Sequence, residues 1–268
     1  MAQNIKGQFL IDRVIERHGG IDLWATVEQI TMQAQTGGIA LPLRFKFGAF
    51  KNYQAQIRAH EPHVQIRPHP REGMQGIFSG EKVCIETENG ESVQQRNNAR
   101  SVFSDMRHKI WWDHLDAIHF AGYALWNYMT TPFLLCRPEI QLQEMPPWQE
   151  NNETWQRLQA TFPPGLLTHS PEQTFYFDAE GLLKRHDYTA LVFGNFAKAA
   201  HYSWNHKEVN GIPFPTRRRV FPRRKDGSPL RLVTLVSIDI EAIEVEMKSN
   251  AGLSPPSTQK SQKNPSLS

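Results

Sequence analysis

The second half of the chain contains six short segments in which polar and apolar side chains alternate, with compact turns between them. The segments are residues 154–162, 173–178, 182–192, 200–209, 216–222 and 231–245. The turns include 178–181, Asn210-Gly211 and Asp226-Gly227, whose residues favour tight connections. Successive strands joined by short turns form an antiparallel meander, as in barrels and half-barrels. This feature therefore predicts a curved antiparallel sheet.

The first half predicts two helices and then more strands. Apolar residues at helical spacing over 5–17, followed by Gly19-Gly20, predict a first helix, and a short second helix over 21–27 carries Trp24 inward. Alternation then predicts strands over 39–50, 53–58, 63–67 and 76–88. Residues 105–135 differ, because they are rich in aromatic side chains, helical in pattern and ended by Pro132.

These segments predict a mainly β chain with helices (α+β). We expect a single curved antiparallel sheet or incomplete β-barrel, with an N-terminal helix and a helical aromatic lid near 105–135. Residues 1–248 are expected to form one domain. Residues 249–268 are rich in Ser, Pro, Gln and Lys without apolar anchors, which predicts a disordered tail.

Charge and composition exclude several classes of protein. The 30 basic and 27 acidic residues give a net charge of +3, too little for a nucleic-acid partner. The basic run 217–219 and 223–225 is typical of a solvated sheet edge. No window approaches the roughly 18 apolar residues of a membrane span, so no stable membrane insertion is expected. The N-terminus lacks the pattern of a secretory signal, which predicts a cytoplasmic protein. Cys84 and Cys136 are expected to be buried free thiols. The sequence leaves the oligomeric state open.

Three motifs carry a family resemblance. They are Arg17-His18-Gly19-Gly20 with Leu23-Trp24 and Val27, Phe175-Tyr-Phe-Asp178 with Gly181-Leu-Leu183, and Gly211-Ile-Pro-Phe-Pro215-Thr-Arg217. The chain resembles the LolA-like lipoprotein-sorting carriers over its first thirty residues and about 155–240. The resemblance implies an incomplete β-barrel, lined with apolar side chains and closed by helices, that can hold an acyl chain or another apolar molecule. The block around Trp111-Trp112-Asp113 has no counterpart in these carriers.

Metal and hydrolase signals are weak. His60, His63 and His69 lie together in a Pro-rich stretch without an acidic or Cys partner at ligand spacing. His201 and His206 are an odd number of residues apart on one strand and should face opposite sides. No Gly-x-Ser-x-Gly motif is present, and Thr168-His169-Ser170 is interpreted as a turn. We therefore expect neither a metal nor another cofactor.

Strand parity suggests a polar cluster inside the barrel. Lys184, His186 and Tyr188 share one face of their strand, whereas Arg185 and Asp187 share the other. On the next strand His201 shares a face with Ser203. If the face of Tyr188 lines the interior, polar groups from neighbouring strands converge there, and burial would shift their pKa values toward acid–base roles. The alternative is that these residues form the solvated face of the sheet.

Two sets of candidate residues follow. The acid–base candidates are His169, Tyr188, His201 and Asp187. The ligand-contact candidates are Trp112, Asp116, His119, Tyr123, Trp126, Tyr202 and Arg217. Asp116 and His119 would share a helix face with Trp112 or Asp113. The aromatic residues of this helix could equally pack as core.

The predicted function is binding of a hydrophobic small molecule or acyl chain in an aromatic-lined cavity. The alternative is a cofactor-independent enzyme of the cyclase, isomerase or lyase type, acting on a hydrophobic substrate by His, Tyr and Asp acid–base chemistry in the same cavity.

Overall fold

A computed structural model describes residues 2–248, so the predicted tail lies outside the described residues. The helices are α1 (Ala2–Arg17), α2 (Gly20–Thr26), η1 (Pro42–Arg44), η2 (Ser101–Ser104), α3 (Met106–Ile110), α4 (His114–Thr130) and η3 (Phe133–Cys136), where η marks a 3₁₀ helix. The strands of the first half are β1 (Val27–Gly37), β2 (Tyr53–Arg58), β3 (His63–Arg67), β4 (Met74–Ser79), β5 (Lys82–Thr87) and β6 (Ser92–Arg96). Those of the second half are β7 (Gln141–Glu150), β8 (Glu153–Thr161), β9 (Glu172–Phe177), β10 (Leu183–Thr189), β11 (Lys198–Val209), β12 (Ile212–Pro222) and β13 (Val236–Met247).

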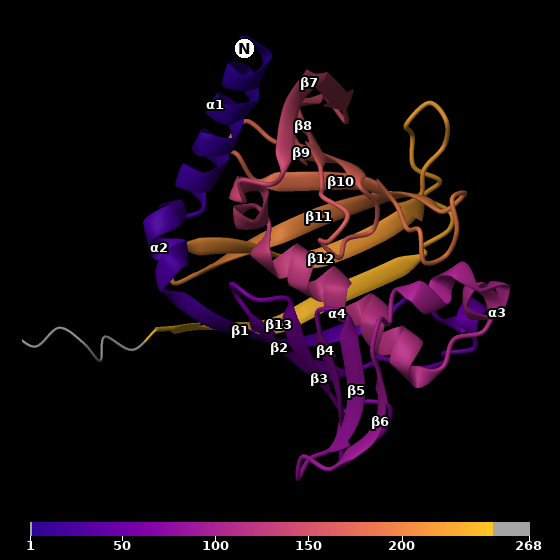
Figure 1. Ribbon diagram of the computed structural model, residues 1–268. Coiled ribbons are helices and arrows are strands. Elements are labelled where there is room, and N and C mark those ends of the chain that lie inside the picture. Colours follow the sequence, from indigo (N-terminus) through magenta and orange to yellow (C-terminus); the bar gives the residue numbers. More distant parts are fainter. Residues whose placement is uncertain (1, 249–268) are drawn as a thin grey trace, which may run out of the picture.

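All thirteen strands form one antiparallel sheet in the order β6-β5-β4-β3-β2-β1-β13-β12-β11-β10-β9-β8-β7. The two halves of the chain are joined where β1 pairs with β13. Each half is a meander, because all neighbouring strands apart from β1 and β13 are also consecutive in sequence. The sheet curves around a central helix without closing (Figure 1). The predicted fold class is therefore confirmed: a single curved antiparallel sheet with a few helices.

Helix α4 fills the concave side of this sheet (Figure 1). Nearly all of its residues are buried, which is typical of a helix enclosed by protein rather than lying at a surface. Two glycines allow its close approach, since a Cβ at Gly122 would lie 2.2 Å from Cβ of Phe78, and one at Gly76 2.0 Å from Cδ1 of Ile118. The helical block was expected to cover the barrel mouth, but α4 lies deeper, inside the curved sheet.

The N-terminal helices cover another part of the core. Helix α1 packs against β7 and β8, and Leu10, Ile11 and Val14 are buried. Trp24 of α2 turns inward as predicted, and its ring stacks on Phe133 with centroids 4.3 Å apart. Gly19 and Gly20, at φ 91° and 87°, provide the left-handed backbone that separates the two helices.

Some strand predictions were wrong for identifiable reasons. Residues 39–50 form a loop with the 3₁₀ helix η1, because Pro42 and the positive φ angles of Phe45 and Phe50 interrupt an extended chain. The predicted strand 76–88 is two strands, β4 and β5, with a turn at Gly80. Strands β6 and β7 were missed, since β6 is largely exposed and β7 contains Pro146-Pro147 at an irregularity of its pairing.

The described residues contain two free cysteines. Cys84 is buried as expected, but Cys136 is exposed, so the prediction of two buried thiols was wrong for Cys136. Between residues 2 and 248 no helix is long and apolar enough to cross a membrane.

Candidate functional site

Three of the four acid–base candidates meet on the inner face of the sheet, the face that contacts α4. The ring of Tyr188 (β10) stacks on His169, which lies in the β8–β9 connection, with centroids 3.9 Å apart. The hydroxyl of Tyr128 (α4) lies 2.7 Å from His169 Nε2 and 3.1 Å from the Tyr188 hydroxyl. His201 (β11) lies edge-on to the Tyr128 ring at 4.6 Å. The pairing of His186 with His201 places Tyr188 and His201 on a common face, which parity within each strand left open.

The imidazoles of this cluster are neutral. His169 and His201 are fully buried, and burial is the main reason that the pKa of each lies well below its usual value. The positive charges of Arg100, near His169, and Arg218, near His201, lower these pKa values further. Burial likewise lowers the pKa of His186 to about 3, and its Nε2 lies 2.6 Å from the side-chain oxygen of Gln173. Burial raises the pKa of Tyr188 well above its ordinary value. The cluster therefore contains uncharged donors and acceptors at neutral pH.

Arg218 is the charged member of the cluster. Its guanidinium lies 5.1 Å from the centre of the Tyr128 ring, and Nη2 donates to the Tyr128 carbonyl at 3.1 Å. It is 2% exposed, and within residues 2–248 no carboxylate lies at ion-pair distance from it. Nε of Arg218 and both ring nitrogens of His201 have no hydrogen-bond partner among the described residues. Because buried cations are normally paired, this is an unbalanced positive site.

A cavity of about 330 Å³ leads from the surface to the outer edge of this cluster. His169, Tyr188 and Phe120 lie at its inner end, and Leu43, Arg44 and Phe196 belong to its outer part, where Leu43 and Phe196 are exposed. Apolar side chains form most of the remaining wall: Ala40, Ala190, Phe193, Ala197, Ala199, Val220, Pro222, Leu235 and Val236, with Lys198. The cavity thus combines a mostly apolar wall with an inner end formed by the neutral polar side chains of His169 and Tyr188, near the charged Arg218.

The fourth acid–base candidate, Asp187, lies on the opposite face of β10. It accepts two hydrogen bonds from Arg185, at 2.7 and 2.8 Å, and one from the Tyr176 hydroxyl at 2.9 Å. Tyr202 also lies on this outer face, where its hydroxyl donates to Glu150 at 2.6 Å. The apolar part of this network is Trp155, Tyr176, Ala200, Tyr202 and Phe221, packed against Trp148 and Trp204. The structure therefore separates Asp187 and Tyr202 from the cavity.

Arg217 is exposed, at a position that pairs with Asp239 of β13. Its neighbour Arg218 points to the inner face instead. Arg217 therefore lies away from the cavity lining, whereas Arg218 lies on the inner face, and parity alone does not say which face is concave.

The aromatic candidates of the helical block are core residues. Trp112, Tyr123 and Trp126 are buried, and Trp126 Nε1 donates to the Arg58 carbonyl at 3.1 Å. His119 lies among Phe78, Phe103 and Tyr123, and neither ring nitrogen has a partner in the described part of the chain. Of these residues, Tyr123 touches the polar cluster, with its hydroxyl 3.3 Å from His169 Nδ1.

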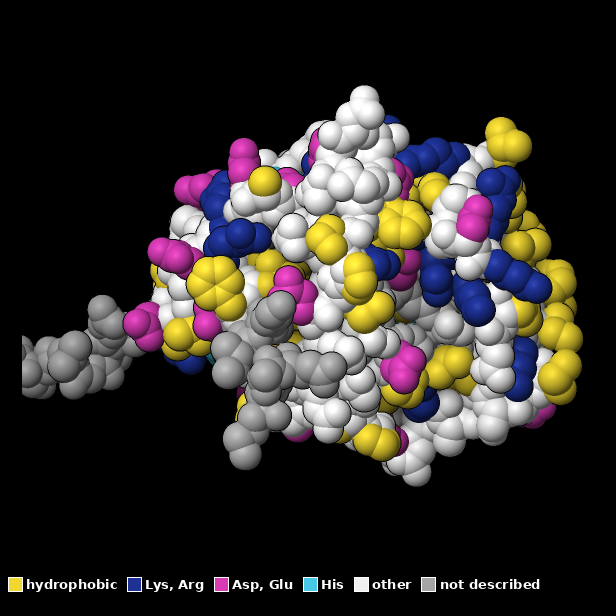
Figure 2. Space-filling model, turned by 90° about the horizontal axis from the view of Figure 1, so that it is seen from above, with side chains coloured by type: hydrophobic (Ala, Val, Ile, Leu, Met, Phe, Trp, Pro, Cys, Tyr) yellow, Lys and Arg dark blue, Asp and Glu magenta, His cyan; other side chains and the backbone are white. Residues whose placement is uncertain are grey.

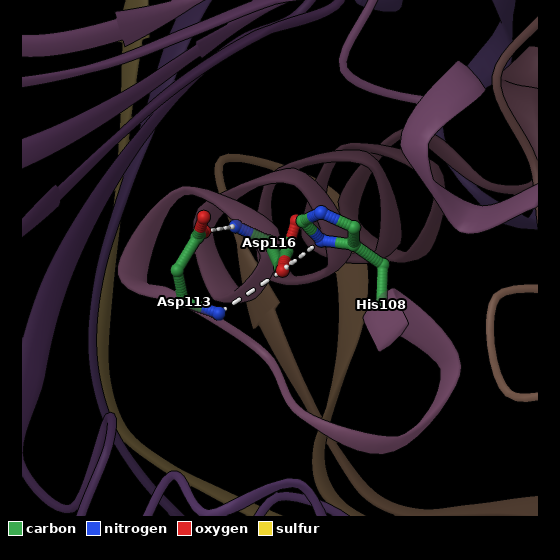
Figure 3. A group of neighbouring side chains, drawn as sticks. All are labelled: His108, Asp113 and Asp116. Atoms are coloured by element: carbon green, nitrogen blue, oxygen red, sulfur yellow. Dashed lines mark hydrogen bonds and ion pairs between the residues drawn. The ribbon is translucent and has the colours of Figure 1, made fainter. Parts of the chain in front are cut away.

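Asp116 caps α4. Asp113 and Asp116 form a capping box, with reciprocal bonds of 2.8 and 3.0 Å between side chains and backbone N–H groups (Figure 3). Asp116 lies 2.7 Å from His108 Nδ1 and 2.6 Å from Arg96 Nη1, and Arg96 also binds Asp113. His108, Asp113 and Asp116 have ligand atoms within 4.8 Å of one another, but Arg96 already balances the carboxylates. This group is a helix cap, and Asp116 contacts His108 rather than His119.

Sequence reasoning missed two central residues of the cluster, Tyr128 and Arg218. Tyr128 was interpreted as one of several aromatic core residues, and Arg218 was left on the face opposite the chosen arginine. The pairing of Arg218 with Ser203 places it diagonally from His201 on the same face. Knowledge of this register would have identified Arg218 as a member of the cluster, but strand pairing is not visible in a single sequence.

Comparison with known proteins supports the fold alone. No protein-family model matches the chain, and no curated protein matches it. A structure of a DUF1329 family protein from Desulfovibrio piger is similar over 92% of this chain and 95% of that one, with 13% identity and a TM-score of 0.50. A LolA superfamily protein from Nitrosomonas europaea matches over 90% and 93%, with 10% identity and a TM-score of 0.51. A putative outer membrane lipoprotein-sorting protein domain from Vibrio parahaemolyticus matches over 94% and 95%, with 7% identity and a TM-score of 0.51. The chain therefore has a LolA-like fold, as the sequence motifs implied.

Proposed function

We propose that this protein binds a hydrophobic small molecule or an acyl chain in the cavity that ends at His169 and Tyr188. The main support for this proposal is the cavity itself. It has a volume of about 330 Å³ and a wall that is almost entirely apolar, and exposed Leu43 and Phe196 flank its mouth. Ligand sites in proteins are typically concave, apolar and ~300–1,000 Å³ in volume, with a few placed polar groups. The cavity meets each of these criteria.

The wall favours an apolar ligand because it offers little to a polar one. Ala190, Ala199, Val220 and Val236 carry no hydrogen-bonding side-chain atoms, so a polar ligand would lose its bonds to water there. Each methylene of a ligand removed from water contributes about 0.8 kcal/mol. An aliphatic chain therefore gains affinity with each carbon that the cavity accommodates.

The inner end favours a ligand with one polar terminus. Tyr188 lines this end, and its hydroxyl lies 3.1 Å from that of Tyr128. The Arg218 guanidinium lies 5.1 Å from the centre of the Tyr128 ring and has no carboxylate partner among the described residues. A nearby positive charge with no counter-charge makes this end electrostatically suited to a carboxylate or similar anion. An amphiphile with its head group near Tyr188 and its chain toward Phe196 fits both properties.

The similar Vibrio parahaemolyticus structure is described as a putative lipoprotein-sorting protein. Lipoproteins carry acyl chains, so an apolar ligand for the present chain agrees with the use suggested for that fold. The proposal itself rests on the cavity of this chain. A cytoplasmic location, predicted from the sequence, remains part of the proposal and is checked by cell fractionation.

One observation favours the enzyme alternative. His169, held neutral by burial, borders the cavity and is linked through the Tyr128 hydroxyl to Tyr188, which resembles a general base with orienting partners. Replacement of His169 by Gln separates the two functions. A carrier would keep most of its affinity, whereas an enzyme would lose about 10²–10⁴-fold in turnover.

Filling the cavity tests the binding proposal. Ala197 lines the cavity and is only partly buried, so Ala197→Trp places an indole in the cavity without disturbing the core. Ala25→Trp, on the exposed surface of α2, is the matched control. Fluorescence titration with an alkyl-chain probe should show binding to the wild type and to Ala25→Trp, and an affinity about tenfold or more lower for Ala197→Trp. Equal binding by all three proteins, or binding by none, would refute the proposal.

A further inference from the structure

Large apolar side chains are exposed around the mouth of the cavity. Phe196 is 80% exposed, Phe47 75%, Leu43 58% and Trp111 53%. Single exposed apolar residues are normal on protein surfaces, but a group of this size at one place marks an interaction site. Aromatic residues dominate the group, which is typical of surfaces that meet either a partner or the interface of a membrane.

Three segments bring these side chains together: 37–52, 104–112 and 190–198. The first and third contribute Leu43 and Phe196 to the cavity itself. The second is joined to the first because the ring of Trp111 stacks on Phe45 with centroids 4.5 Å apart. The segments that carry the exposed apolar side chains are therefore joined to one another or contribute to the ligand cavity. We call these three segments the mouth loops.

The mouth loops are strongly basic. They contain Arg44, Lys46, Lys51, Arg107, Lys109 and Lys198, whereas their one acidic residue is Asp105. This excess is larger than the net charge of +3 carried by the whole chain. The adjacent segment 68–73 adds one Arg and one Glu, which leaves the balance unchanged. In the view from above, hydrophobic and basic side chains are interleaved toward the right-hand end of the molecule (Figure 2).

The opposite end of the sheet has the reverse charge. Its hairpin turns contain Glu61, Glu81, Asp178 and Glu180 and no Lys or Arg; they are 59–62, 80–81, 151–152, 178–182 and 210–211. The pairings place these turns at the other ends of the strands from 37–52 and 190–198. The charge asymmetry therefore runs along the strands and gives the molecule a preferred orientation at a negatively charged surface.

We infer that the mouth loops dock on an anionic lipid bilayer, with Phe47, Phe196 and Trp111 entering the head-group region. Basic side chains attract a protein to anionic lipid, and exposed aromatic side chains then hold it at the interface. Docked in this way, the cavity mouth would face the acyl region, so an apolar ligand could enter without crossing water. The docking itself does not depend on the ligand proposal, because vesicle binding is measured without any ligand.

The positive charge of the mouth loops disfavours a second copy of the chain as their binding partner. A two-fold symmetric contact would bring the same basic loops of two molecules face to face, and like charges repel at such an interface. An anionic bilayer instead complements both the apolar and the basic side chains of the mouth loops.

Vesicle co-sedimentation of the full chain tests the inference. Vesicles of phosphatidylcholine alone are compared with vesicles in which part of that lipid is replaced by phosphatidylglycerol. We expect the protein to sediment with the anionic vesicles, less with the neutral ones, and less as salt is added. The double variant Phe47→Ser/Phe196→Ser should lose about tenfold or more of its partition, since both side chains are exposed and their loss leaves the fold intact.

Matched controls localise the effect. Phe9→Ser removes an aromatic side chain that is 73% exposed on α1, outside the mouth loops, and should bind as the wild type does. Lys51→Glu should weaken binding, whereas Lys82→Glu, on β5, should not. Failure of the wild type to bind anionic vesicles, or equal losses in Phe9→Ser and the double variant, would overturn the inference. So would a dimer in sedimentation velocity that the double variant dissociates.

Discussion

Arg218 is the residue whose surroundings most clearly call for a ligand. It is buried, it carries a charge, and its Nε has no partner among the described residues. Burial lowers the pKa of Arg218 to about 10, so the side chain remains charged at neutral pH. An uncompensated buried charge destabilises a fold, and proteins retain such groups where a bound partner uses them.

Replacing Arg218 by Met should therefore separate stability from binding. The variant keeps the volume of the side chain and removes the buried charge, so we expect thermal stability equal to or above that of the wild type. Affinity for alkyl carboxylates should fall relative to alkyl alcohols of the same length. Calorimetry gives the stability, and titration with the two ligand series gives the preference. An unchanged carboxylate-to-alcohol ratio would exclude Arg218 from head-group selection.

Buried histidines make the fold sensitive to acid. Burial lowers the pKa of His119 to about 3, and the positive charges of Arg100 and Arg96 act in the same direction. In the unfolded chain the pKa returns to its ordinary value of about 6.5. Below that pH the unfolded state takes up a proton that the folded state does not, so stability is present above about pH 6.5 and is lost as the pH falls.

The variant His119→Phe should lose less stability in acid. Near pH 5, protonation of one such histidine in the unfolded state alone lowers the free energy of unfolding by about 2 kcal/mol. Unfolding by urea at about pH 8 gives the packing effect of the substitution alone, and the same measurement near pH 5 adds the protonation effect. If wild type and variant lose equal stability between the two pH values, His119 is not neutral in the folded state.

The sequence indicated which polar residue types could form a cluster, but not which face of the sheet carries them. Parity grouped His186 with Tyr188 and His201 with Ser203, and the strand pairing then puts both groups on one face. Asp187 and Tyr202 were chosen with them, although the period of two puts Asp187 on the other face of its strand. Arg217 was chosen over Arg218. Which face is concave depends on the position of α4, and no local pattern in the strands contains that information.

Helix α4 determines the geometry of the whole site, because it contributes Tyr128 and Tyr123 to the cluster. Its distance from the sheet depends on Gly122 and Gly76, where no side chain separates backbone from neighbour. A Cβ at Gly122 would overlap Cβ and Cγ of Phe78, at 2.2 and 2.4 Å. These atoms lie near the backbone of β4 and cannot simply rotate away.

We therefore expect Gly122→Ala to destabilise the protein by about 1–3 kcal/mol, as overpacking of a core typically does. The control is Gly165→Ala, because a Cβ at Gly165 meets nothing within 4 Å. Equilibrium unfolding in urea measures both. Equal stability of the two variants would mean that α4 can move away from β4 at little cost, which would contradict the tight packing of this helix.

The start of α4 depends on its capping box. Asp113→Ala removes the side chain that accepts from the Asp116 N–H at 2.8 Å and also binds Arg96. Loss of such a cap costs about 0.5–2 kcal/mol. Asp22→Ala, in the exposed first turn of α2, serves as the comparison. Added Zn²⁺ or Mg²⁺ should leave the melting temperature of the wild type unchanged, and a clear increase would show that Asp113 and Asp116 hold a metal instead.

At the element scale, the strands with strong alternation were predictable and the others were not. The compact turns at 178–182 and 210–211 fixed β9 to β12 within a few residues. Strand β7 contains two prolines, and β6 is almost wholly exposed, so neither has the alternation that identifies a half-buried strand. The loop 39–50 alternates like a strand, but it forms η1, and its residues Ala40, Leu43 and Arg44 line the cavity.

The whole molecule is a half-open barrel with unequal ends. The antiparallel sheet wraps around α4 (Figure 1). The turns at one end of the sheet are acidic, and the mouth loops at the other end are basic and apolar. Composition gave the near-neutral total charge, but only the fold shows that the charges are separated along the strands. The resemblance to LolA-like carriers predicted the barrel, whereas the cavity and its mouth are properties of this chain that three-dimensional packing reveals.

Photolabelling reports where an apolar ligand lies in the protein. A fatty acid with a diazirine on its alkyl chain is bound, irradiated, and its attachment sites are mapped by peptide mass spectrometry. We expect labels within 39–44, 190–199 and 235–236, which contain residues that line the cavity. These labels should be lost in Ala197→Trp but not in Ala25→Trp. Labels confined to other segments, or labels unchanged in Ala197→Trp, would contradict the assignment of this cavity as the binding site.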